Sequence, residues 1–188
     1  MCFSFRVSLA TFISSWSISL YLLNKGLSEK RKQLVIALMI FSSMQVPDAI
    51  LWYTGMKKNN LNFLTTSILI PLILSLQILY NVYVMNKNKN KIISLVTILF
   101  ILYIFFRFQG YSSPLCGSRL SSPIWGSNEL KYWELIPFVF LILYPRWTIL
   151  AQTLFIILPI IYLITGGGYG SLWCAIANII AFYYLYKF

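Results

Sequence analysis

The chain contains no histidine and very few acidic residues. Histidine is the commonest metal ligand and the usual general base near neutral pH, so its absence weighs against metal chemistry and acid–base catalysis. Only 4 of the 188 residues are Asp or Glu, against 15 Lys or Arg, and there are only 3 cysteines. We therefore expect no metal and no cofactor.

Charge of either sign is scarce, at 10% of residues, whereas 59% are hydrophobic. A soluble domain carries about 25% charged residues. The net charge of +11 would otherwise suggest nucleic acid, but the basic residues fall in short segments between apolar runs. That is their ordinary place in a membrane protein, so we expect a lipid bilayer and no nucleic acid as partner.

The apolar runs predict an all-α, polytopic membrane bundle of about seven transmembrane helices in a single domain, 1–188. A long polar loop rich in Ser, Pro and Gly separates the fourth and fifth runs, and its aromatic residues Tyr111 and Trp125 suggest that it packs against the bundle. In span three, Gln77 and Asn81 lie four apart and suggest hydrogen bonding between helices. The expected spans are 4–23, 34–54, 61–85, 92–107, 132–145, 148–165 and 171–187, with the loop at 109–131.

The first expected span is unusually rich in serine and threonine, which include Ser8, Thr11, Ser15 and Ser19. Small hydroxyl residues let membrane helices approach closely. We therefore expect this span to lie in the interior of the bundle rather than to face lipid.

Basic residues are distributed unequally between the two sides that seven spans would define. The side bearing the N-terminus has 6 Lys or Arg and the other side has 9. Because the basic side is usually cytoplasmic, we expect the N-terminus outside and the C-terminus in the cytoplasm.

The second span carries an acid. Gln45, Asp48 and Trp52 are spaced i, i+3, i+7 and so share one helical face, beside Pro47. Proline removes a backbone donor and frees the carbonyl of Ser43. A carboxylate near the centre of a membrane helix costs at least about 2.5–3.5 kcal/mol. Asp48 is therefore either a site for a proton, ion or substrate, or a structural clasp satisfied by a neighbour such as Arg6.

Other reactive residues fall on the same predicted side. Cys2 begins span one, Cys116 lies in the long loop, Cys174 begins span seven and Glu134 begins span five. The seven-span arrangement allows a disulfide between Cys2 and Cys116, although three cysteines do not fix a pairing. Their spacing matches no metal-ligand pattern.

Three short motifs resemble a family of uncharacterised small multi-pass membrane proteins found in bacteria and large DNA viruses. The chain opens Met1-Cys2-Phe3-Ser4; its second span has the spacing Gln-x-x-Asp-x-x-x-Trp, with Asp48 where the family has Glu; its last span has Trp173-Cys174. The resemblance implies that the N-terminus, the acid and the Trp-Cys pair form one site. It brings no known activity, and the shorter Asp side chain departs from the family pattern.

Three functions follow as hypotheses. The first is a transporter or channel for a small solute, ion or proton, in which Asp48 binds the proton or cation. The second is a structural or scaffold membrane protein, in which Asp48→Asn leaves function intact. The third is a membrane-embedded enzyme with Cys2 or Cys174 as nucleophile and Asp48 or Glu134 as acid or base. Rapid alkylation of either cysteine would favour the third.

Overall fold

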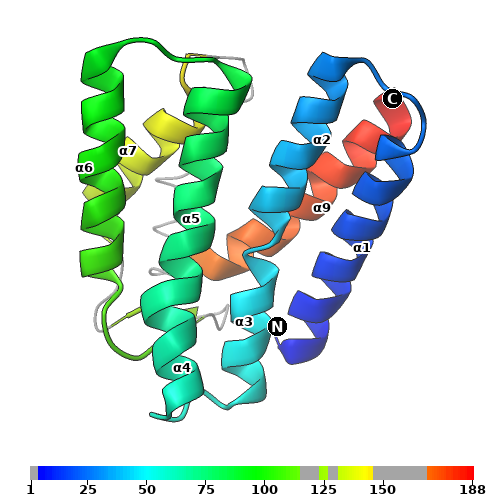
Figure 1. Ribbon diagram of the computed structural model, residues 1–188. Helices are drawn as coiled ribbons and strands as arrows, with labels where there is room; N and C mark the ends of the chain where they lie inside the picture. The colour runs from blue at the N-terminus through cyan, green and yellow to red at the C-terminus, as the bar shows by residue number, and fades with distance from the viewer. Residues whose placement is uncertain (1–3, 115–122, 127–130, 146–168) are drawn as a thin grey trace.

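The computed structural model describes residues 4–114, 123–126, 131–145 and 169–188, and these are mostly helical (Figure 1). Within them, three helical segments are long and apolar enough to cross a membrane: Phe5–Leu23, Glu29–Tyr53, which a turn divides, and Asn60–Met85. This supports a helical membrane protein. It does not support a count of seven spans.

The helices at the expected spans 92–107 and 132–145 lie close to those bounds but are shorter than the first three helical segments. Helix α6, Lys91–Arg107, has 17 residues, and α7, Tyr132–Leu143, has only 12. At 1.5 Å per residue, α7 covers about 18 Å, well short of the ~30 Å hydrocarbon core. The expected span 148–165 lies outside the described residues. The last helix, α9, runs from Tyr169 to Lys187 and covers the seventh expected span.

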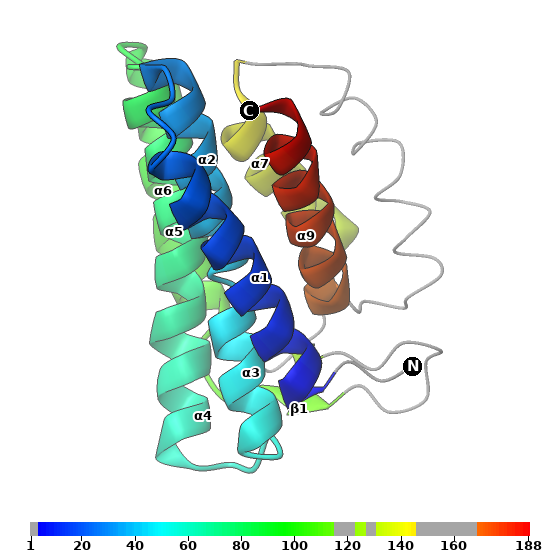
Figure 2. The same cartoon turned by 90° about the vertical axis from the view of Figure 1, so that its right-hand side faces the viewer.

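Helix α1, Phe5–Leu23, is capped by Ser4, whose side chain accepts a hydrogen bond from the Val7 backbone N–H at 3.4 Å. It packs against α2, α3 and α9 (Figure 2). The expectation of an interior helix is wrong, because Ile13 and Tyr21 on its opposite face are exposed. The expected close packing is nevertheless present, since the buried face carries Ser8, Ser15 and Ser19.

The second expected span is two helices rather than one. Helix α2, Glu29–Ser42, ends at a turn over Ser43 and Met44, and α3, Gln45–Tyr53, follows. Pro47 cannot donate to the Ser43 carbonyl, which instead accepts the Val46 N–H at 3.0 Å. A three-residue turn bond from Val46 thus replaces the four-residue helical bond that Pro47 cannot make. The helix is interrupted a few residues before Asp48.

The third span is continuous but contains two wide turns. It comprises α4 (Asn60–Leu64), the π-helical turn η1 (Thr65–Leu69), α5 (Ile70–Leu79) and a second π-helical turn, η2 (Tyr80–Met85). Pro71 lies at the start of α5, directly after η1. Wide turns of this kind often occur at functional sites.

The described parts of the long loop contact the bundle, as expected for Trp125, whereas Tyr111 is exposed. The loop's strands β1 (Ser113–Pro114) and β2 (Pro123–Ile124) pair antiparallel, and Trp125 directly after β2 is only 4% exposed. The main core lies between α3, α5, α6, α7 and this loop. In Figure 1, the loop, the start of α1 and the turn between α3 and α4 lie at the lower end, whereas the C-terminus lies at the upper end.

Candidate functional site

Asp48 lies in the first turn of α3 and is buried, with 1% of its surface exposed. The Trp125 indole Nε1–H donates a hydrogen bond to Asp48 Oδ1 at 2.9 Å. Trp125 is itself held edge-on against Phe108, with ring centroids 6.3 Å apart. The long loop therefore supplies the partner of the buried acid, from 77 residues further along the chain.

Gln45 and Trp52 lie on the same side of α3 as Asp48. Gln45 is fully buried, and the Thr11 hydroxyl of α1 lies 3.5 Å from its Oε1. Trp52 is half-buried and packs against the main core, while its Nε1–H has no hydrogen-bond partner among the described residues. The three motif residues thus point to the interior from one helix.

The remaining predicted site residues are not brought to Asp48 by the described part of the chain. Arg6 is exposed, and no ion pair between it and Asp48 occurs among the described residues. Cys2 and Cys116 lie outside those residues, so their predicted disulfide stays a prediction. Trp173 and Cys174 lie in the first turns of α9, and of residues 169–175 only the backbone is described.

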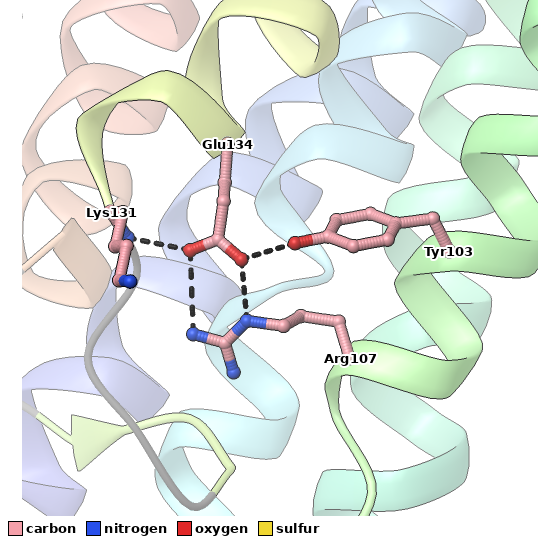
Figure 3. Close-up of polar contacts among 4 residues, drawn as sticks. All are labelled: Tyr103, Arg107, Lys131 and Glu134. Carbon is pink, nitrogen blue, oxygen red and sulfur yellow. Dashed lines mark hydrogen bonds and ion pairs between the residues drawn. The ribbon is translucent and has the colours of Figure 1, made fainter.

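Glu134 occupies a different polar cluster, between the end of α6 and the start of α7 (Figure 3). Arg107 Nε lies 2.5 Å from Glu134 Oε1, which also accepts the Tyr103 hydroxyl. Glu134 Oε2 accepts the Lys131 backbone N–H at 2.6 Å, as in a helix-capping box. A cation at the end of α6 and an anion at the start of α7 also complement the two helix dipoles.

A small, partly open pocket lies between α5, α6, α7 and the loop. Most of its wall is apolar, and includes Leu74, Phe100 and Phe138. Its polar lining comes from Tyr103, Arg107 and Glu134, and Trp125 forms a further part of the wall. Trp125 therefore contacts both Asp48 and the pocket that the ion pair lines.

Further hydrogen bonds tie the start of the long loop to η1 and α4. Asn62 Nδ2 donates to the Ser112 carbonyl at 2.9 Å, and the Thr66 and Ser112 hydroxyls lie 2.7 Å apart. The Gly110 backbone N–H donates to Ser67 Oγ at 3.1 Å. All of these side chains are buried, so this end of the loop is firmly held.

The expected hydrogen bonding of Gln77 and Asn81 is confirmed for one of them. Asn81 Nδ2 donates to the carbonyls of Leu141 at 2.7 Å and Tyr144 at 2.8 Å, at the end of α7. Pro145 has no N–H to offer the Leu141 carbonyl, so Asn81 replaces the missing donor. Gln77 is buried, and its amide has no partner among the described residues.

Sequence reasoning missed Trp125 as a partner of Asp48, and Tyr103 and Arg107 as partners of Glu134. The spacing of Tyr103 and Arg107, four apart at the end of an apolar run, was a signal for the second cluster. No group of three or more potential metal ligands occurs in the part of the chain that the structure describes. No protein-family model, curated protein or solved structure matches this chain.

Proposed function

We propose that the protein moves a small solute, an ion or protons across a membrane, and that Asp48 is the group that binds the moving species. One observation carries the proposal: a carboxyl group lies fully buried in an apolar span, and its hydrogen bond from the described residues comes from a neutral indole N–H. A buried carboxylate normally needs a cationic partner. Asp48 therefore suits a transport cycle in which its carboxyl group alternately binds and releases a proton or a cation.

The break between α2 and α3 supports the same proposal. Discontinuous helices are a common way to build binding sites inside transporters. The break puts Asp48 in the first turn of α3, where the positive end of the helix dipole favours the ionised form. Burial favours the neutral form, so the two effects oppose each other at one carboxyl group.

The membrane arrangement forms part of the proposal. We propose that the shorter helices and α9 complete a polytopic bundle of about seven helices, with the upper end of Figure 1 in the cytoplasm. Exposed basic residues in the turns at that end support this orientation. They include Lys25, Lys30, Arg31, Lys87 and Lys89. The N-terminus would then be outside, and membership of the resembled family remains a proposal.

The scaffold function is the second candidate, and one observation favours it. The Trp125–Asp48 bond and the bonds of Asn62 and Thr66 to Ser112 join the loop to the bundle. Such contacts are what a structural clasp requires. The described residues provide no observation in favour of a cysteine enzyme.

Transport is tested with the purified chain in phosphatidylcholine–phosphatidylglycerol vesicles. An internal pH dye reports protons, and sodium- and potassium-sensitive dyes report those ions. We expect flux in the wild type, its loss in Asp48→Asn, and no change in Glu29→Gln, which removes an exposed acid at the start of α2. Equal flux in Asp48→Asn and wild type would contradict a role for Asp48, and wild-type vesicles as tight as empty ones would favour the scaffold.

A further inference from the structure

A row of polar side chains runs through the interface of α1 with α3 and α9. The spacing of Ser8, Thr11, Ser15 and Ser19 puts them on one face of α1. Thr11 Oγ1 lies 3.5 Å from Gln45 Oε1 of α3, and Ser15 Oγ donates to Asn178 Oδ1 of α9 at 3.2 Å. We call this row the polar seam: Ser8, Thr11, Ser15 and Ser19 with Gln45 and Asn178.

The contacts between α1 and α3 fix which residues lie at the level of Asp48. Thr11 contacts Gln45, and the Phe5 and Tyr53 rings lie 5.6 Å apart, so the two helices run antiparallel. Ser8 precedes Thr11 by three residues in α1, and Asp48 follows Gln45 by three residues in α3. The register therefore puts Ser8 at the level of Asp48, at one end of the seam.

Ser8 supplies an independent indication of a ligand. Its side chain is 1% exposed, and its hydroxyl oxygen has no hydrogen-bond partner among the described residues. Buried polar groups are nearly always satisfied, by protein or by ordered water. A buried hydroxyl at the level of a buried carboxyl thus marks a place for a bound water molecule.

We infer that the polar seam is a proton path that connects Asp48 to the opposite half of the bundle. This inference rests on the proposed transport function and narrows the moving species to protons. From Ser8 to Ser19 the seam extends about 16 Å, roughly half of a hydrocarbon core.

Among the described residues no hydrogen bond joins successive seam hydroxyls, and those of Thr11 and Ser19 donate to carbonyls of α1. The path therefore requires water molecules between the hydroxyls. Each hydroxyl would accept a proton on its oxygen while it releases its own, so it would end each transfer unchanged.

The contact distances favour protons over metal cations. The seam's two interhelical contacts are single pairs of atoms, at 3.2 and 3.5 Å, whereas a metal cation needs several oxygen ligands around one point. Charge along the seam is confined to Asp48. The other described charged residues of α1, α2, α3 and α9 lie at or near helix ends: Arg6, Glu29, Lys30, Arg31, Lys32 and Lys187.

The test compares hydroxyl removal inside and outside the seam, in the full chain in sealed vesicles with an internal pH dye. Thr11→Val keeps the shape of the side chain and removes its hydroxyl, whereas Thr11→Ser keeps the hydroxyl. We expect Thr11→Val to lower proton flux about fivefold to tenfold, the rate equivalent of one neutral hydrogen bond, and Thr11→Ser to retain it. Ser15→Ala should act like Thr11→Val, and its matched control is Ser14→Ala on the exposed face of α1.

The outcomes separate the two proposals. If Thr11→Val and Ser15→Ala conduct protons like Ser14→Ala while Asp48→Asn does not, the seam is not the path and the function of Asp48 stands. Flux of sodium or potassium without protons overturns the seam in the same way. An inactive wild type overturns both proposals. Gel filtration and circular dichroism check that each variant folds. If Thr11→Val aggregates, Ser15→Ala takes its place in the test, because it removes only one oxygen atom.

Discussion

The described residues include two buried carboxyl groups, Glu134 and Asp48, whose surroundings differ. Glu134 is 5% exposed and is matched by a guanidinium, a phenol and a backbone N–H, whereas Asp48 is 1% exposed and accepts one bond from an indole. A carboxylate surrounded by donors is fixed in one state. A carboxyl group with a single neutral donor can gain or lose a proton at a lower cost in free energy. Among the described residues, Glu134 thus has the surroundings of a structural group, whereas the sparser hydrogen bonding of Asp48 fits the role that we propose for it.

The largest expected effect comes from removing the cation beside Glu134. Arg107→Ala leaves a buried carboxylate without its ion-pair partner, and we expect it to lower the free energy of unfolding by about 3–5 kcal/mol. Equilibrium unfolding in mixed detergent micelles measures it, with exposed Lys58→Ala as control. The double variant Arg107→Ala/Glu134→Gln should recover part of the loss. A loss no larger than that of Lys58→Ala would show that the pair is not structural.

Removing the donor to Asp48 should have a smaller effect. Trp125→Phe keeps a ring against Phe108 and deletes the N–H, and we expect a loss of about 1–3 kcal/mol for an unsatisfied buried acceptor. The same unfolding assay measures it, and Trp133→Phe is the matched control because Trp133 is 57% exposed. Equal stability of the two variants would mean that the indole bond contributes nothing.

Tyr103→Phe sharpens the description of the Glu134 cluster. It removes one of several donors, and Arg107 and the Lys131 backbone N–H remain. We expect a loss of about 0.5–1.5 kcal/mol in the unfolding assay. Tyr186→Phe, at a side chain that is 92% exposed, should show no loss. A loss as large as that of Arg107→Ala would contradict a cluster with several independent donors.

Asp48→Asn should have the smallest effect on stability and yet remove transport. The amide oxygen of asparagine can still accept the Trp125 N–H, so we expect a change below about 0.5 kcal/mol, the lower end of the range for one hydrogen bond. Unfolding and proton flux are measured on the same preparation. A large loss of stability with unchanged flux would make Asp48 structural, like Glu134.

The sequence predicted the helical membrane character, the buried acid and the packing of the loop through Trp125. It did not predict the Asp48–Trp125 bond, because a neutral indole leaves no charge pattern and the two residues are far apart in the chain. Pro47 indicated that the Ser43 carbonyl loses its helical partner, but the turn at Ser43 and Met44 was missed because residues 34–53 contain no glycine and no loop-like polar stretch that would mark a break. The short helix α7, Tyr132–Leu143, lies close to the expected span at 132–145.

The hydrogen bonds of Asn81 bear on how the chain enters the membrane. Helix α7 is too short to insert as an independent span, and its final carbonyls need the Asn81 amide. A ribosome makes α5 and the turn that carries Asn81 well before α7. The hydrogen-bond donor for the end of α7 is thus already synthesised when α7 leaves the ribosome. Docking of α7 against this earlier segment, rather than hydrophobicity alone, would then bring it into the bundle.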